Sequence, residues 1–448
     1  MRQGPFAAQE GSEGVAQNSS ETLINMYAHI DISGKSQLVR HQRPGLTLAH
    51  AQSGVKRGIE EFVHGHYAVI RDIFYKFNGT ALTPLGTLGT NIGNVTMITD
   101  DNNNVAISDG VTLYHYAAST GLFTLPTTPT TVGTLAILDG FGIYNEPNSG
   151  TFYISALNDL TDWDALDFAT AEDHPDPIIR VFTSHNEIWF FGTETIEVWR
   201  NIGAQTFPFA PNTTIERGCA AAYSVASEDN TLFWLGDDHI VYRADGYRPA
   251  RISTDAIDHW IADAPDASTG KAFIYTHHGH KFYVLTFPDY GTRQYNVATG
   301  FWNACQSFGE EDWEITGGAG KNVTYYLTPA GFVTLDESKN TDAGAIMERG
   351  GTSAPVWSDG ELMTLSTFWL NCEVGKVAVT ASEPQVTLQV STDGEMFGNH
   401  KARGLGLTGN YIRRVVWRNL GQARQFVLKL SCTDDVSFTI MSTHGDIA

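Results

Sequence analysis

Residues 178–209, IIRVFTSHNEIWFFGTETIEVWRNIGAQTFPF, decide the predicted fold. Runs of β-branched and aromatic residues alternate here with short segments of Gly, Asn, Ser and Thr, which is the pattern of strands joined by tight turns. We therefore predict one antiparallel sheet of four strands. The predicted strands are Ile178–Thr183, Glu187–Phe191, Thr195–Arg200 and Gln205–Phe209.

The same order of strands and turns recurs along most of the chain. The interval is about 40 to 45 residues, which is the period of propeller blades. The sequence therefore predicts an all-β protein with a β-propeller of about six or seven four-stranded blades. Besides the stretch quoted above, the candidate units are Arg57–Gly89, Gly93–Pro126, Gly133–Ala169, Ala220–Thr254, Lys271–Ser307 and Trp313–Arg349.

The C-terminal part of the chain has a different pattern. Strand-like runs follow the Gly-rich segment 341–353, and in one of them Val386, Leu388 and Val390 point to the same face. About 90 residues of this kind predict a small β-sandwich. The predicted domains are an N-terminal arm with the first strands (1–56), the propeller (57–350) and the C-terminal β-sandwich (351–448).

Composition argues against several classes of function. The chain has 28 Lys and Arg against 50 Asp and Glu, a net charge of −22, which disfavours binding through DNA phosphates. Four widely spaced cysteines without a C-x-x-C pair predict buried thiols rather than a zinc centre or a disulfide framework. No run approaches the roughly 20 apolar residues of a transmembrane helix, so we expect no membrane insertion. The one helical candidate is Asp255–Ala264.

Patterns of catalytic and metal-binding residues are weak. Glycosidases need two carboxylates about 5 to 9.5 Å apart, but the acidic residues of the blades lie at turns and no pair stands out. His64-Gly65-His66 and His277-His278-Gly279-His280 offer imidazoles, yet no Cys or carboxylate partner can be named for them. We expect both to be hairpin tips, and we predict no catalytic residue, no cofactor and no metal.

Basic residues concentrate in the predicted sandwich of this acidic chain. They form either a solvated strand face or a surface for an acidic partner, held by bidentate pairs between Arg and carboxylates. Nucleic-acid binding is a third alternative. The residues are Lys401, Arg403, Arg413, Arg414, Arg418, Arg424 and Lys429, and we predict Arg413, Arg414, Arg418 and Arg424 as partner-binding residues.

Three blocks of residues carry a family resemblance. The first contains Asn25-Met26-Tyr27, Lys35-Ser36 and Arg43-Pro44-Gly45-Leu46. The second contains Pro175-Asp176-Pro177-Ile178-Ile179, Trp189, Phe191-Gly192, Thr195-Ile196-Glu197 and Gly203-Ala204. The third contains Ser391-Thr392-Asp393-Gly394, Arg413-Arg414-Val415-Val416-Trp417, Leu420-Gly421 and Phe426-Val427-Leu428-Lys429-Leu430. In this order they resemble the packaged-DNA stabilisation proteins, which are the tail hub or nozzle proteins of short-tailed, P22-like bacteriophages.

The resemblance implies a structural protein of the virion tail, made in the cytoplasm of the host bacterium. Six copies would form a ring below the portal and its adaptor ring, and the sandwich would bridge subunits or hold tail spikes or fibres. The lumen would conduct DNA without sequence-specific binding, and a needle or plug protein would help to retain the DNA. We expect the negative charge to be biased toward the channel wall.

Two other functions fit the composition. A carbohydrate-active or carbohydrate-binding propeller would be a monomer with a ligand pocket at the centre of the blades. A scaffold propeller would bind cellular proteins.

Overall fold

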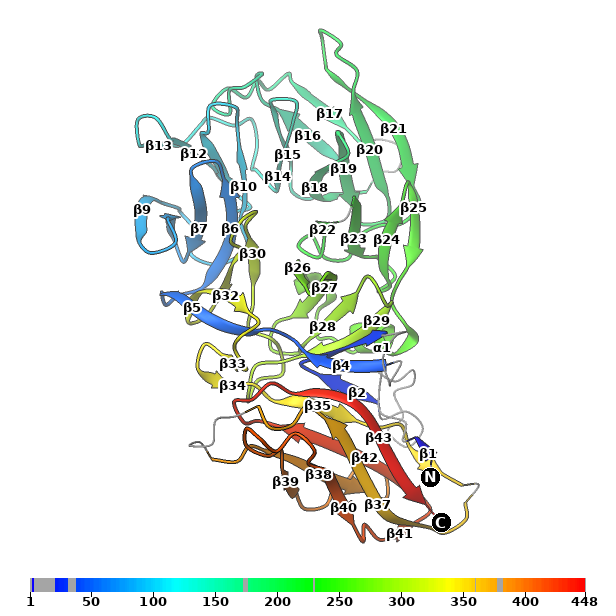
Figure 1. Cartoon of the computed structure of the whole chain (residues 1–448). Coiled ribbons are helices and arrows are strands. Elements are labelled where there is room, and N and C mark those ends of the chain that lie inside the picture. The colour runs from blue at the N-terminus through cyan, green and yellow to red at the C-terminus, as the bar shows by residue number, and fades with distance from the viewer. Residues whose placement is uncertain are drawn as a thin grey trace.

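The computed structural model describes residues 2–3, 21–30, 38–171, 176–228, 230–358, 360–376 and 382–447. A propeller and a β-sandwich lie one above the other in Figure 1, as the predicted fold class requires. Apart from Arg2–Gln3 (β1), the predicted N-terminal arm of residues 1–20 lies outside the described residues. The same holds for Lys35, Ser36 and Pro175.

Six blades are four-stranded antiparallel sheets built from consecutive strands. Blade one contains β6 (Lys56–Phe62), β7 (Gly65–Ile70), β8 (Ile73–Phe77) and β9 (Leu82–Thr87). Blade two contains β10 (Thr96–Thr99), β11 (Val105–Ser108), β12 (Leu113–Ala117) and β13 (Leu122–Thr124). Blade three contains β14 (Leu135–Leu138), β15 (Phe141–Asn145), β16 (Thr151–Ile154) and β17 (Phe168–Thr170).

The next three blades follow the same plan. Blade four contains β18 (Ile178–Ser184), β19 (Glu187–Gly192), β20 (Ile196–Asn201) and β21 (Phe209–Ile215). Blade five contains β22 (Ala226–Glu228), β23 (Thr231–Leu235), β24 (Val241–Asp245) and β25 (Arg248–Arg251). Blade six contains β26 (Lys271–His277), β27 (His280–Phe287), β28 (Gly291–Asn296) and β29 (Phe301–Cys305). Between blades five and six lie α1 (Asp255–Ala262), where the helix was predicted, and η1 (Ala267–Thr269).

The fourth strand of blade four differs from the prediction. It was expected at Gln205–Phe209, but β21 begins only at Phe209. The backbone N–H of Ile202 donates to the carbonyl of Pro208, so residues between them form the connecting loop and the return strand starts opposite Asn201. Pro211 made this segment look unlike a strand in the sequence, because proline cannot donate a backbone hydrogen bond. A proline is tolerated here because β21 is the outermost strand of the blade.

Blade seven is closed by a strand from the N-terminal part of the chain. Its inner strands are β30 (Gly317–Ala319), β31 (Tyr325–Thr328) and β32 (Gly331–Asp336). The outer strand is β5 (Gly45–Ala51), which pairs antiparallel with β32 and places Leu46 opposite Leu335. Backbone hydrogen bonds therefore join the two ends of the propeller. The short strands β33 (Thr341–Asp342) and β34 (Ala345–Ile346) extend this sheet.

The sandwich takes strands from both ends of the chain. One sheet has the order β3 (Met26–Ile30), β4 (Leu38–Gln42), β43 (Thr439–Ile447), β37 (Met363–Cys372) and β40 (Val415–Arg418), with β1 beside β43 and β41 (Gln422–Ala423) beside β37. The other has β2 (Thr22–Ile24), β35 (Arg349–Thr352), β42 (Gln425–Cys432), β38 (Gln385–Ser391) and β39 (Lys401–Gly404), with β36 (Val356–Trp357) beside β42. Because β2 also pairs with β29, this sheet continues into blade six.

Seven apolar clusters fill the spaces between neighbouring blades, and an eighth fills the sandwich. Trp189 of blade four, for example, shares a cluster with Trp234 of blade five. Ile59 of blade one and Phe332 of blade seven share another, so the ring of clusters is complete. The four cysteines are buried free thiols, as predicted. No helix in the described ranges has the length and apolar character needed to cross a bilayer.

A buried ionic network joins the propeller to the sandwich. The guanidinium of Arg43 contacts both carboxylate oxygens of Asp342, at 2.9 and 2.6 Å, and the two side chains are 0% and 8% exposed. Arg43 Nε donates to Asn25 Oδ1 at 2.9 Å, and the guanidinium lies 4.3 Å from the ring centre of Trp313. Asn25 Nδ2 donates in turn to the carbonyls of Gln306 and Glu348. One cluster of side chains thus fixes β2, β5, β29 and β33.

We expect Asp342→Ala to lower the free energy of unfolding by about 3 to 5 kcal/mol, because it leaves the Arg43 charge buried without its partner. Denaturant unfolding of the full chain measures this loss. The control is Asp255→Ala, which removes an exposed partner of Arg251 and should cost less than about 1 kcal/mol. Similar small losses in both variants would contradict a structural role for the buried pair.

Candidate functional site

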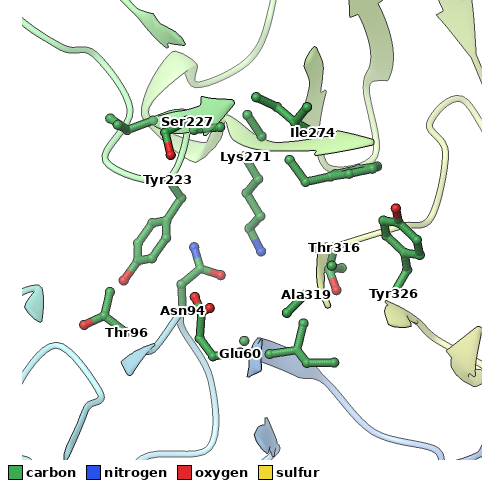
Figure 2. Close-up of a pocket in the computed structure, with 18 of the residues that line it drawn as sticks. Glu60, Asn94, Thr96, Tyr223, Ser227, Lys271, Ile274, Thr316, Ala319 and Tyr326 are labelled. Atoms are coloured by element: carbon green, nitrogen blue, oxygen red, sulfur yellow. The ribbon is translucent and has the colours of Figure 1, made fainter. Parts of the chain in front are cut away.

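The first strands of the blades surround a cavity of about 680 Å³ at the centre of the propeller. All seven blades contribute to its lining. Figure 2 shows Lys271 of β26 extending toward Glu60 of β6 and Asn94, while Tyr223 approaches from blade five. The volume is in the range of small-molecule pockets, so the cavity is the first candidate for a binding site.

Cationic side chains outnumber carboxylates in the described lining of this cavity. The cations are Arg57, Arg180, Lys271 and Lys321, and the carboxylates are Glu60 and Glu228. Arg57 is used structurally, since its guanidinium donates to the carbonyls of Arg71, Thr90 and Gly93. Arg180 lies 5.2 Å from the ring centre of Tyr223, and burial lowers its pKa.

The two carboxylates have different environments. Glu228 accepts a hydrogen bond from Lys281 Nζ at 2.7 Å and is neutralised by it. Glu60 is exposed to the cavity, yet the protein around the cavity desolvates its carboxylate. This desolvation raises the pKa of Glu60 to about 7 against the opposing effect of Arg180. The described lining therefore holds one carboxylate that is already paired and one that is largely protonated below neutral pH. It offers no evident pair of acids for glycoside hydrolysis.

We expect Glu60→Gln to raise the melting temperature at pH 8 and to leave it unchanged at pH 4. The folded state holds the Glu60 proton up to about pH 7, whereas the unfolded chain releases it near 4.5, so the carboxylate destabilises the fold increasingly between these values. Thermal unfolding at both pH values tests this, and pH 4 serves as the internal control. An equal change in the melting temperature at pH 8 and at pH 4 would contradict the raised pKa of Glu60.

The predicted partner-binding arginines are exposed on the sandwich. Arg413 and Arg414 directly precede the edge strand β40, and Arg418 is its last residue, so these three lie at one edge of the sheet. Arg424 lies apart from them, between β41 and β42. Strand β39, the edge of the opposite sheet, adds Lys401 and Arg403, and Arg403 Nε donates to the carbonyl of Val416. We call Lys401, Arg403, Arg413, Arg414 and Arg418 the basic edge.

Among the described residues, ion pairs and side-chain hydrogen bonds involve Arg413 and Arg403 of this basic edge. Arg413 forms an ion pair with Glu383, whose carboxylate also accepts the backbone N–H of Gly406. Charged residues on edge strands also keep a sheet from pairing with other chains. This protective role alone explains the presence of some residues of the basic edge. The predicted role in partner contact stays a prediction.

Family models match almost the whole chain. Residues 9–334 match the model described as "Bacteriophage P22 Gp10, beta-propeller", and residues 352–447 match "Bacteriophage P22 Gp10, beta-sandwich". The chain belongs to the bacteriophage P22 Gp10 family. It is a structural protein of the phage virion, as the resemblance of the three sequence blocks implied. A search of curated proteins finds no match.

Solved structures similar to this Gp10 family member come from unlike proteins. They include a chain of the mitotic checkpoint complex (11% identity, 69% of this chain and 95% of that chain, TM-score 0.43). The extracellular domain of the putative one component system BT4673 from B. thetaiotaomicron is another (13% identity, 83% and 50%, TM-score 0.45). A third is the N-terminal domain of Nup159 (9% identity, 70% and 98%, TM-score 0.39). At TM-scores below 0.5 these likenesses carry no argument about function.

The structure of this Gp10 family member also shows candidate contact residues that sequence reasoning missed. Ile412 is 95% exposed and Tyr411 63% exposed, directly before the Arg413-Arg414 pair. Protein interfaces combine apolar and aromatic side chains with Arg in this way. The signal in the sequence was the Tyr-Ile dipeptide next to two arginines, but only the fold shows that neither apolar side chain enters the core.

Proposed function

We propose that this chain is the tail hub, or nozzle, of a short-tailed phage. Six copies form a ring below the portal-adaptor complex, retain the packaged DNA and line the conduit for its ejection. The observation that carries the proposal is the match of both domains, in order, to the P22 Gp10 family models. The further partners are tail spikes or fibres and a needle or plug protein.

The charge distribution supports assembly of identical copies. The chain has 50 Asp and Glu against 28 Lys and Arg, so a cationic patch of one copy can find acidic partners on a neighbouring copy. The basic edge provides such a patch, with Ile412 and Tyr411 beside it as apolar anchors. Arg binds carboxylates through paired, charge-assisted hydrogen bonds, and such contacts fix the orientation of a partner as well as holding it.

The net negative charge also supports passage of DNA without capture. A lumen wall rich in carboxylates repels phosphates, and the low content of Lys and Arg limits the counterion release that drives nonspecific binding. The location of the acidic surface relative to the lumen stays part of the proposal.

The runner-up function is a carbohydrate-active or carbohydrate-binding propeller, which the central cavity of about 680 Å³ favours. The charged lining and the paired state of Glu228 argue against hydrolysis there.

Assembly separates the two functions. Light scattering and negative-stain imaging of the full chain, with and without the portal-adaptor complex, should show a ring-sized particle in at least the second condition. A monomer in both conditions would refute the tail hub.

We expect Arg414→Glu to weaken assembly about tenfold or more, because it places a carboxylate against an acidic neighbour. Arg414 suits the test better than Arg413, whose change would also break the ion pair with Glu383. The control is Arg248→Glu on β25 of the propeller, an exposed arginine that undergoes the same charge change. The concentration dependence of the assembled fraction measures both. Equal weakening by both variants would contradict a specific role for the basic edge.

A further inference from the structure

Five histidines gather where the propeller meets the sandwich. His29 lies on β3, His41 on β4, and His277, His278 and His280 lie at the β26–β27 hairpin of blade six. His29 Nδ1 and His280 Nε2 are 2.9 Å apart, and the rings of His41, His277 and His280 all lie within 6 Å of the ring of Tyr27. The predicted hairpin is present, since His277 pairs with His280. The two residues are buried at the ends of their strands, however, and do not lie on a solvated loop as expected.

The fold supplies the carboxylate that the sequence could not identify. Glu337 directly follows β32 of blade seven, and its Oε1 lies 3.2 Å from His277 Nδ1 and 4.0 Å from His278 Nδ1. One potential ligand atom from each of these three residues lies within 4.8 Å of the others. Donor atoms around a four-coordinate Zn²⁺ are about 3.3 to 3.5 Å apart, given bonds of about 2.1 Å. Small movements of the exposed His278 and Glu337 side chains would bring the ligand atoms from within 4.8 Å of one another to the spacing that Zn²⁺ requires.

The turn of the hairpin explains why two consecutive histidines can share one site. Neighbouring strand residues normally point to opposite faces. His278, however, has φ 48° and leaves the strand, so its ring centre comes within 4.1 Å of that of His277. The His277 side chain is 5% exposed, whereas His278 and Glu337 are 58% and 60% exposed. The site thus has one fixed ligand and two that are accessible from solvent.

The surroundings have room for a fourth ligand. His277, His278 and Glu337 line a hollow of about 90 Å³ together with His41 of β4 and with Ser437 and Thr439 near the start of β43. A water molecule can occupy the remaining position of a four-coordinate ion. Because β4 and β43 belong to the sandwich, the hollow lies between the two domains.

We propose that His277, His278 and Glu337 form a binding site for a divalent transition metal ion, with Zn²⁺ as the best fit. Two imidazoles and one carboxylate are a known zinc ligand set. The bound ion links the β26–β27 hairpin of blade six to blade seven, next to the pairing of β32 with the closing strand β5. The metal acts as a structural clamp at the domain junction.

The test uses the full chain after chelator treatment. Calorimetric titration with Zn²⁺ should give one ion per chain with micromolar or tighter affinity, and the melting temperature should rise. Co²⁺ in place of Zn²⁺ should give visible absorption bands from coordination by the protein. Absence of stoichiometric binding would overturn the proposal.

Two variants assign the ligands. His278→Ala and Glu337→Gln change exposed side chains, and each should weaken Zn²⁺ binding at least tenfold while the metal-free protein keeps its circular dichroism spectrum. His64→Ala, at the exposed hairpin tip of blade one, is the matched control and should bind as the parent does. Unchanged affinity in the two ligand variants, or an equal loss in the control, would overturn the assignment. None of these results depends on ring assembly.

Discussion

The Arg43–Asp342 ion pair is the constraint on which the joint between the domains depends. A guanidinium presents five N–H donors, and burial requires that they be used. Arg43 directs them to Asp342, Asn25 and the carbonyls of Pro44 and Gln306. Burial alone would lower the pKa of Arg43, but the carboxylate of Asp342 raises it above its ordinary value. A buried pair of this kind adds little net stability compared with an apolar core, but breaking it is costly. Here it connects four chain segments through hydrogen bonds.

The closed ring of blades follows from the same geometry. A single four-stranded sheet has two faces to bury, and each blade here buries them against its neighbours through the seven apolar clusters. The ring has no free end, because β5 leaves Arg43 and Pro44 and pairs at once with β32. The ionic network therefore holds the chain directly before the strand that closes the propeller. The contacts that join the two domains and the strand pairing that closes the propeller are therefore adjacent in the structure.

The sequence pattern predicted those parts of the fold that form between residues close together in the sequence. Alternating apolar residues and turn residues located the first three strands of blade four, the helix at Asp255 and the change of pattern after the Gly-rich segment 341–353. The outer strand β5 was not predicted as part of a blade, because its partner lies on β32, far away in the sequence. Glu337 was not found as a partner of His277 for the same reason. Arg413 was located by composition, but its pairing with Glu383 required the fold.

The closing strand also constrains the order in which the molecule can be made. The ribosome delivers β5 early, while its partner β32 emerges only after six blades have been synthesised. At roughly 5 to 20 residues per second, this delay is on the order of 15 to 60 s. During that time the hydrogen-bonding edge of β5 has no native partner, and it is open to pairing with other nascent chains. The pairing of β5 with β32 closes the mature propeller. Until β32 has been synthesised, the same arrangement leaves the incomplete chain vulnerable to aggregation.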